Sequence, residues 1–138
     1  MTTSTVTYSA GLRTTCTHTR SGNAIITDAP VDNHGRGEAF SPTDLVATAL
    51  ATCMLTVMGI AAENRGLSID GAHAEVTKIM AADPRRISEV KVLIHMPPYD
   101  FSEAHKKLLT EIALNCPVAK SLHADLIQSV ELRWGEIE

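Results

Sequence analysis

The stretch SPTDLVATALATCMLTVMGIAAENRG, residues 41–66, has the features of one long helix. Ser41 is a typical N-cap residue, and Pro42 suits the first helical position. Asp44, three residues after Ser41, completes a capping box. Gly66 favours the end of the helix. The sequence therefore predicts a helix of about 24 residues here.

This helix is apolar on every side, and residues 45–62 carry no charge. A segment of that length is sufficient for a membrane span to be considered. However, three threonines and several alanines make it only mildly apolar, and Asp44 and Glu63 bound it directly. We therefore expect no membrane contact and a buried helix, enclosed by a sheet or by a partner chain.

Around this helix the sequence predicts strands and two shorter helices. Ser102 and Pro117 are suited to open the two helices. Strands clustered before and after helices indicate an α+β fold, and a length of 138 residues suits one domain, residues 1–138. Strands are expected at residues 6–18 (with a bulge at Gly11), 24–28, 68–81, 87–96 and 127–134, and helices at 102–113 and 117–122.

Composition excludes several classes of function. A net charge of −4 without a basic run offers little attraction to a phosphate backbone, so nucleic acid is not expected as a partner. The N-terminus lacks the basic and apolar regions of a secretion signal, so we expect a cytoplasmic protein. Cys16 and His18 share a strand face without a second close pair, and the other cysteines and histidines are scattered, so no metal site is expected.

Cys53 and Cys116 can each be interpreted in two ways. A cysteine inside an apolar helix, as at Cys53, is usually a small core residue. Cys116 precedes Pro117 and would lie at the N-cap of the short helix. Unpaired N–H groups and the positive end of the helix dipole favour a thiolate at that position. From position alone, each cysteine could be structural or reactive.

Two segments of the sequence resemble one family. They are SPTDL at residues 41–45, followed by small and apolar residues into Cys53, and NCPVAKSL at residues 115–122. Together they resemble the OsmC/Ohr family of osmotically inducible protein C and organic hydroperoxide resistance proteins, and the resemblance covers nearly the whole chain. It implies an OsmC-like fold in which antiparallel strands wrap two main helices. It also implies an intertwined homodimer with active sites at the subunit boundary.

The resemblance further implies an enzyme, a thiol peroxidase that reduces organic hydroperoxides without a metal or another cofactor. Cys53 would be the peroxidatic cysteine, which becomes a sulfenic acid, and Cys116 the resolving cysteine, which condenses with it to a disulfide. An external dithiol, of lipoyl type in this family, would then reduce the disulfide.

The resemblance also implies an arginine over the reactive sulfur, because a cation must compensate for the burial of a thiolate. Arg36, in a glycine-rich and charged loop before the long helix, is the predicted residue, with Arg13 and Arg20 as alternatives. The family holds this arginine with a glutamate that follows the helix-start proline. Here Thr43 occupies the matching position, and Asp44 is the candidate substitute.

Thr43 supports an alternative function of another class. In this alternative, the chain has the same fold but lacks strong peroxidase activity, and it binds an apolar ligand or a cellular thiol in the dimer cleft. The two functions differ in one observable property. Only the peroxidase loses the free thiols of Cys53 and Cys116 when a hydroperoxide is added.

Overall fold

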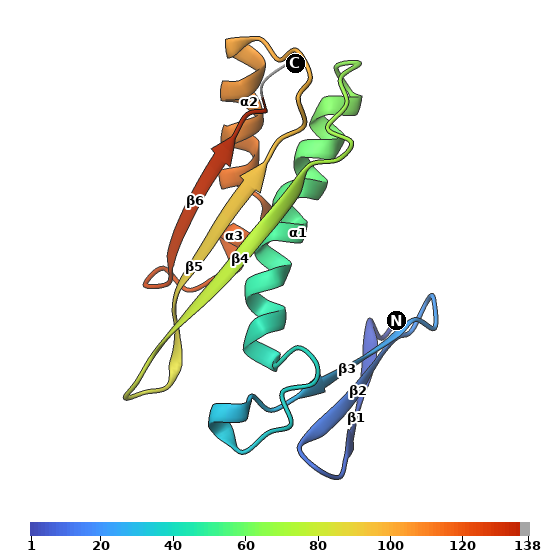
Figure 1. Cartoon of the computed structure of the whole chain (residues 1–138). Coiled ribbons are helices and arrows are strands. Elements are labelled where there is room, and N and C mark those ends of the chain that lie inside the picture. The colour runs from blue at the N-terminus through green and yellow to red at the C-terminus, as the bar shows by residue number, and fades with distance from the viewer. Residues whose placement is uncertain (136–138) are drawn as a thin grey trace. The chain divides into compact units, whose positions relative to one another are not determined.

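The computed structural model describes residues 1–135 and confirms the α+β fold class (Figure 1). Contacts divide the chain into two compact units, Met1–Val46 and Ala47–Glu138. Each unit has its own three-stranded sheet. The expectation of one domain spanning residues 1–138 stays a prediction.

The first unit contains an antiparallel sheet of three strands paired in chain order, β1 (Ser4–Ser9), β2 (Arg13–His18) and β3 (Ala24–Asp28). The expected single strand at residues 6–18 is wrong, because the chain reverses direction at its middle. Gly11 and Leu12 both have a positive φ, 82° and 60°. Glycine adopts this conformation without strain, and the pair forms a tight turn in place of the expected bulge.

One face of this first sheet is apolar and exposed. Val6, Cys16 and Ile25 lie side by side across the three strands, and Tyr8 lies on the same face because it follows Val6 by two residues. The exposed fractions are 63% for Val6, 64% for Tyr8 and 49% for Ile25. We call Val6, Tyr8 and Ile25 the first-sheet face. Grouped apolar side chains of this kind are typical of an interaction surface.

A loop with a short 3-10 helix, η1 (Val31–Asn33), connects β3 to the long helix. Its backbone is bound to the end of β3 at two points. Gly37 N donates to Ala29 O at 3.2 Å, and Asp28 N donates to Phe40 O at 3.0 Å. The charged part of the loop is therefore held against the sheet of its own unit.

The long helix, α1 (Pro42–Glu63), begins where the sequence predicted. Ser41 N donates to Asp44 Oδ2 at 2.9 Å, and Asp44 N donates to Ser41 Oγ at 3.1 Å, which completes the expected capping box. The chain leaves the helix through Gly66, whose φ is 67°. The helix has 22 residues, slightly fewer than expected.

By length and composition alone, α1 could span a membrane, and 39% of its most apolar window is buried within the chain. Leu50, Met54 and Met58 are its largest buried side chains, and they belong to the hydrophobic core of the second unit. Val46 and Ile60 remain exposed. The burial of one side of α1 is typical of a core helix in a soluble protein.

The second sheet has the order β4-β5-β6, with β4 (His73–Ala81), β5 (Arg86–His95) and β6 (Ile127–Arg133). β4 and β5 are antiparallel, but β6 pairs parallel to β5, so the sheet is mixed and not antiparallel throughout as expected. The reason lies in the long helical connection between β5 and β6. It returns the chain to the starting end of β5, which makes a parallel neighbour possible.

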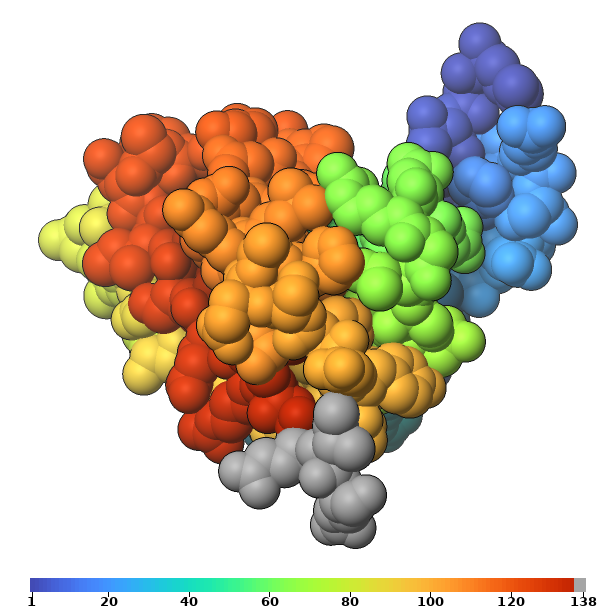
Figure 2. All heavy atoms as spheres, turned by 90° about the horizontal axis from the view of Figure 1, so that it is seen from above, coloured from blue at the N-terminus to red at the C-terminus, as the bar shows by residue number. Residues whose placement is uncertain are grey.

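Two helices form that connection, α2 (Glu103–Leu114) and α3 (Pro117–Ser121). Both begin as predicted, with Ser102 and Cys116 as N-cap residues. Figure 1 shows the helices of this unit on one face of its sheet. In Figure 2 the orange atoms of α2 and the red atoms of β6 form one continuous surface.

The core of the second unit lies between this sheet and the helices. Val90, Val92 and Ile94 alternate along β5 and are buried. They belong to the same apolar cluster as Leu109 and Ala113 of α2. Cys116 is part of this cluster and Cys53 packs against it, so both cysteines are held by the best-packed part of the chain.

Candidate active site

Cys116 lies at the N-cap of α3, directly before Pro117. Its Sγ accepts a hydrogen bond from Ala119 N at 3.4 Å, and its carbonyl oxygen accepts one from Lys120 N at 3.1 Å. The residue is 1% exposed. The local sequence therefore fixes the sulfur at the first turn of a short helix, within the core.

Cys53 lies in the middle of α1, at the boundary between its buried and exposed sides. Thr52 before it is exposed and Met54 after it is fully buried, while Cys53 itself is half-buried. This intermediate position differs from that of an ordinary core cysteine. The residue packs against the core without being enclosed by it.

Cys53 and Cys116 meet at the core of the second unit, although 63 residues separate them in the chain, because Cys53 packs against the apolar cluster that contains Cys116. Both cysteines are free. Burial raises the pKa of Cys116, the N–H of Ala119 opposes this effect, and the neighbouring Cys53 thiol raises the pKa further. Cys116 is therefore a protonated thiol at neutral pH, with the Cys53 thiol as a neighbour.

The three candidate arginines lie in different settings in the first unit. Arg13 forms a two-pronged ion pair with Asp28. Arg20 is exposed in the turn after β2. The guanidinium of Arg36 lies against Gly11, where a Cβ atom would collide with it. Because Arg36 belongs to the first unit and Cys53 to the second, their pairing stays a prediction.

Asp44, the predicted substitute for the family's glutamate, takes part in the cap of α1. Its Oδ2 accepts the hydrogen bond from Ser41 N. Thr43, at the glutamate's position, has its Oγ1 3.3 Å from Ser41 Oγ. The role of Asp44 beside an arginine stays a prediction.

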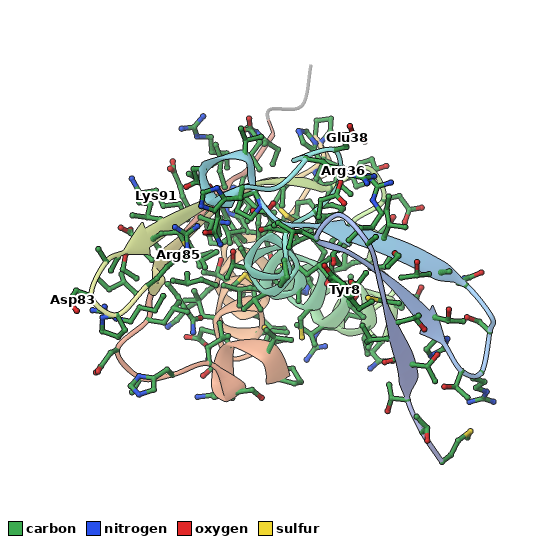
Figure 3. The ribbon with its side chains drawn as sticks, turned by 90° about the horizontal axis from the view of Figure 1, so that it is seen from below. Tyr8, Arg36, Glu38, Asp83, Arg85 and Lys91 are labelled. Atoms are coloured by element: carbon green, nitrogen blue, oxygen red, sulfur yellow. The ribbon has the colours of Figure 1, made fainter. Side chains whose placement is uncertain are left out.

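Sequence reasoning missed two charged residues of the loop region, Asp28 and Glu38. The Asp28 side chain is fully buried, and both residues bind Arg13. Figure 3 shows Glu38 close to Arg36 in the loop after β3. An aspartate that directly ends a strand containing two isoleucines was the available signal, because a charge in such a position usually has a partner.

A family model described as OsmC-like protein matches residues 35–130, which include Cys53 and Cys116. The chain belongs to the OsmC-like protein family. Its structure is similar to that of a Psychrobacter arcticus protein named for osmotic stress induction and detoxification response. The TM-score is 0.93 with 56% identity, and 96% of each chain is covered.

Two more distant structures share the fold. An organic hydroperoxide resistance protein OsmC from Legionella pneumophila has a TM-score of 0.70 and 16% identity, with 96% of this chain and 97% of that chain covered. The organic hydroperoxide resistance protein OhrB of Bacillus subtilis has a TM-score of 0.65 and 18% identity, with 96% and 98% covered. No curated protein matches the chain.

These findings confirm the predicted family and the predicted OsmC-like fold, which is that of a soluble protein. Membership of the OsmC-like family supports a role in redox chemistry or in resistance to peroxides and osmotic stress.

Two hollows differ in their lining. One of about 270 Å³ in the first unit is lined mainly by apolar groups, including Tyr8, Leu12 and Pro30. Another of about 490 Å³ lies on the face of the second sheet that carries Glu75 and Lys91. Within residues 1–135, no three histidine, cysteine or acidic side chains are grouped so as to hold a metal ion.

Proposed function

We propose that this OsmC-like protein is a cytoplasmic thiol peroxidase that reduces organic hydroperoxides through Cys53 and Cys116. The observation that carries the proposal is that the two cysteines meet at one core, Cys116 inside it at the N-cap of α3 and Cys53 packed against it from α1, with the Cys53 thiol acting on the pKa of Cys116. A structural cysteine has no need of a second thiol beside it. A peroxidatic cysteine does need one, because its sulfenic acid must be trapped before further oxidation.

The reaction has three steps. The Cys53 thiolate attacks one oxygen of the hydroperoxide, the O–O bond breaks, and the alcohol leaves after taking up a proton, which makes Cys53 a sulfenic acid. The Cys116 thiol then attacks the Cys53 sulfur, and a disulfide and water form. An external dithiol reduces the disulfide to two thiols and itself becomes a disulfide.

The raised pKa of Cys116 suits the resolving role. Burial is the main cause, so Cys116 stays protonated and does not compete with Cys53 for the peroxide. The thiolate of Cys53 needs a cation, and Arg36 is the residue we assign to this role. Asp44, at the start of the same helix, is the acidic residue we assign to its vicinity.

We also propose that the protein works as a homodimer. The first-sheet face exposes Val6, Tyr8 and Ile25, and α1 exposes Val46 and Ile60. These exposed apolar groups, together with the homodimer that the family resemblance implies, support this assembly. The active sites would then lie at the subunit boundary.

The apolar surroundings of Cys53 support organic hydroperoxides over hydrogen peroxide as substrates. Each CH₂ group that a substrate buries contributes about 0.8 kcal/mol to binding. Cumene hydroperoxide should therefore give a higher kcat/KM than hydrogen peroxide. A lipoyl-type dithiol is the reductant that the family resemblance suggests.

A second function remains to be separated from this one, the binding of an apolar ligand or cellular thiol without strong peroxidase activity. The observation that favours it is Thr43 in place of the glutamate, together with the use of Asp44 Oδ2 in the helix cap. An arginine without a carboxylate to hold it would activate Cys53 less.

The test is turnover of cumene hydroperoxide with dihydrolipoamide as the reductant. We expect steady consumption of the peroxide, and a loss of more than about 1,000-fold in kcat/KM for Cys53→Ser, because the nucleophile is removed. The matched variant Thr52→Ser changes an exposed neighbour on the same helix and should retain activity. Consumption that is equal in wild type and Cys53→Ser would favour the binding protein.

A further inference from the structure

Gln128 is a polar residue on the core-facing side of β6. It lies opposite Val90 of β5, which is fully buried, and Val130 and Leu132, which follow it at intervals of two residues, pack against the apolar core. Alternate residues of a strand point to the same side of a sheet, so an amide stands where an apolar side chain would be favoured. A polar group in such a place is costly unless it is hydrogen-bonded, and this glutamine therefore requires an explanation.

The amide of Gln128 is bonded to the short helix that has Cys116 at its N-cap. Gln128 Nε2 donates to Ala119 O at 3.0 Å, in a partly buried position. In a longer helix this oxygen would accept from the N–H four residues later, but α3 ends at Ser121. The glutamine therefore supplies, from the neighbouring strand, the donor that the short helix cannot provide.

The same residue, Ala119, contacts the sulfur of Cys116. Ala119 N donates to Cys116 Sγ at 3.4 Å, while Ala119 O accepts from Gln128. One residue thus links a thiol to a strand of the sheet. An N–H directed at sulfur stabilises negative charge there, and this bond lowers the pKa of Cys116 against the effect of burial.

α3 depends on bonds to its surroundings because it has only five residues. A helix of one turn is unstable in isolation, since its first hydrogen bond must offset the ordering of several residues. None of the residues in Pro117–Ser121 is fully buried. The direction of the Ala119 N–H is therefore set in part by the bond from Gln128.

The resolving step makes a specific demand on this arrangement. The Cys116 sulfur attacks the sulfur of the Cys53 sulfenic acid, the S–O bond breaks, and a disulfide forms. The hydroxide that leaves combines with the proton of the Cys116 thiol to give water. Negative charge develops on Cys116 Sγ as its proton departs, and a fixed N–H directed at this sulfur stabilises that charge without reorganisation.

We propose that Gln128 is a positioning residue for the resolving step, which holds Ala119 from β6 so that the Ala119 N–H stays directed at Cys116 Sγ. Gln128 acts through Ala119 and is not itself a catalytic group. The inference rests on the proposed function and deepens it. Every residue on which it depends belongs to the unit that begins at Ala47.

The experiment compares the wild type with Gln128→Met, whose side chain has a similar length and shape but no N–H donor. The first readout is the pH profile of iodoacetamide alkylation at Cys116, measured by mass spectrometry of its peptide from the full-length protein. This readout needs no peroxide. The matched control is Ser88→Ala, which removes another partly buried side-chain bond of the same unit, from Ser88 Oγ to Ile79 O at 3.0 Å.

The second readout is the fate of Cys53 after the protein is mixed with an excess of cumene hydroperoxide. Dimedone, added at successive times, traps the sulfenic acid. Mass spectrometry then measures the sulfenic, disulfide and sulfinic forms of Cys53. This readout separates the attack of Cys53 on the peroxide from the resolving step.

We expect Gln128→Met to move the midpoint of the Cys116 profile to higher pH by about one pH unit, because a donor to the thiolate is displaced while burial remains. Disulfide formation should slow about 10-fold, and more sulfinic acid should accumulate at Cys53. The sulfenic acid itself should form at the wild-type rate. Ser88→Ala should behave as wild type in both readouts.

A second variant covers the case in which Gln128→Met does not fold. Gln128→Glu keeps the shape of the side chain but has no donor at neutral pH, and it should give the same slow disulfide formation with a normal rate of sulfenic acid formation.

Two results would overturn the inference. One is a Cys116 profile that Gln128→Met leaves unchanged or moves to lower pH, because a merely loosened core would relieve the burial that raises the pKa of Cys116. The other is an equal slowing of sulfenic acid and disulfide formation, which indicates a general structural role. Failure of the proposed function looks different: wild-type protein forms neither product, while the alkylation profile still reports whether Gln128 acts on Cys116.

Discussion

The two units of the chain bury opposite kinds of side chain. Of the described residues, the buried apolar ones all belong to the unit that begins at Ala47, whereas the buried polar ones, Thr27, Asp28 and Ser41, all belong to the first unit. The second unit is held by an apolar core that contains Cys116. The first is held by hydrogen bonds and ion pairs, and its apolar residues are exposed.

This difference suggests that the two units have different structural roles. Hydrophobic burial is the main source of stability, so the second unit has the means to fix two sulfur atoms rigidly. The first unit lacks such a core, and its polar network fixes a charged loop instead. Its first-sheet face is exposed, and in the proposed homodimer we expect a second copy of the chain to pack against it.

The largest effect is expected from breaking the apolar core. Leu109 on α2 is 0% exposed, and Leu109→Ala should lower the free energy of unfolding by about 2–5 kcal/mol, through lost burial and a cavity. Urea unfolding measured by circular dichroism checks this. Leu114→Ala, which truncates the 45% exposed leucine at the end of the same helix, is the control and should cost far less. Equal losses would contradict the assignment of the core.

The next largest effect is expected on the affinity of the proposed homodimer, through the first-sheet face. Tyr8→Ala should weaken the homodimer by about 2 kcal/mol, close to 30-fold in Kd, as loss of a large interface side chain does. Sedimentation velocity over a range of concentrations measures it. Ile127→Ala truncates a residue of the second sheet that is 59% exposed, and it is the control. A dimer insensitive to Tyr8 but weakened by Ile127→Ala would place the interface on the other unit.

The ion pair between Arg13 and Asp28 should make the stability of the fold depend on pH in the acid range. The bonds from Arg13 lower the pKa of Asp28, so this carboxylate stabilises the fold above the ordinary aspartate value of about 4. The contribution is lost as the pH falls through the lowered pKa. Thermal melts from pH 7 to pH 3 should therefore show a gap between wild type and Asp28→Asn that narrows in acid. A gap that widens in acid would contradict the ion pair.

The smallest expected effect is a difference between Cys53 and Cys116 in their rate of alkylation. Burial raises the pKa of Cys116, and alkylation requires the thiolate, so Cys116 should react with iodoacetamide after Cys53 and only at pH above the ordinary thiol value of about 8.5. Peptide mapping over a pH series measures both rates. Urea should abolish the difference, whereas faster reaction of Cys116 in the native protein would exchange the proposed roles.

Local signals in the sequence predicted much of this structure. The capping box of α1, the N-cap of α2 and the position of Cys116 before Pro117 each depend on residues within one helical turn. For that reason they could be read directly from the chain. The resemblance, and not the spacing, suggested that Cys53 and Cys116 work together.

Features that depend on distant contacts were missed. The reversal between β1 and β2 requires a positive φ at Leu12, a residue type that gives no turn signal. The parallel pairing of β6 depends on how far the helical connection carries the chain. The partners of Asp28 lie 15 and 10 residues away along the chain. Sequence patterns within one element contain no information on such pairings.

The most direct test of the account follows the two sulfur atoms themselves. Reduced protein is mixed with one equivalent of cumene hydroperoxide, alkylated, digested and mapped by mass spectrometry. We predict a disulfide that joins the Cys53 and Cys116 peptides in the wild type and a trapped Cys53 sulfenic acid in Cys116→Ser. Unmodified thiols at both positions after exposure to the peroxide would contradict the claim that they are a redox pair.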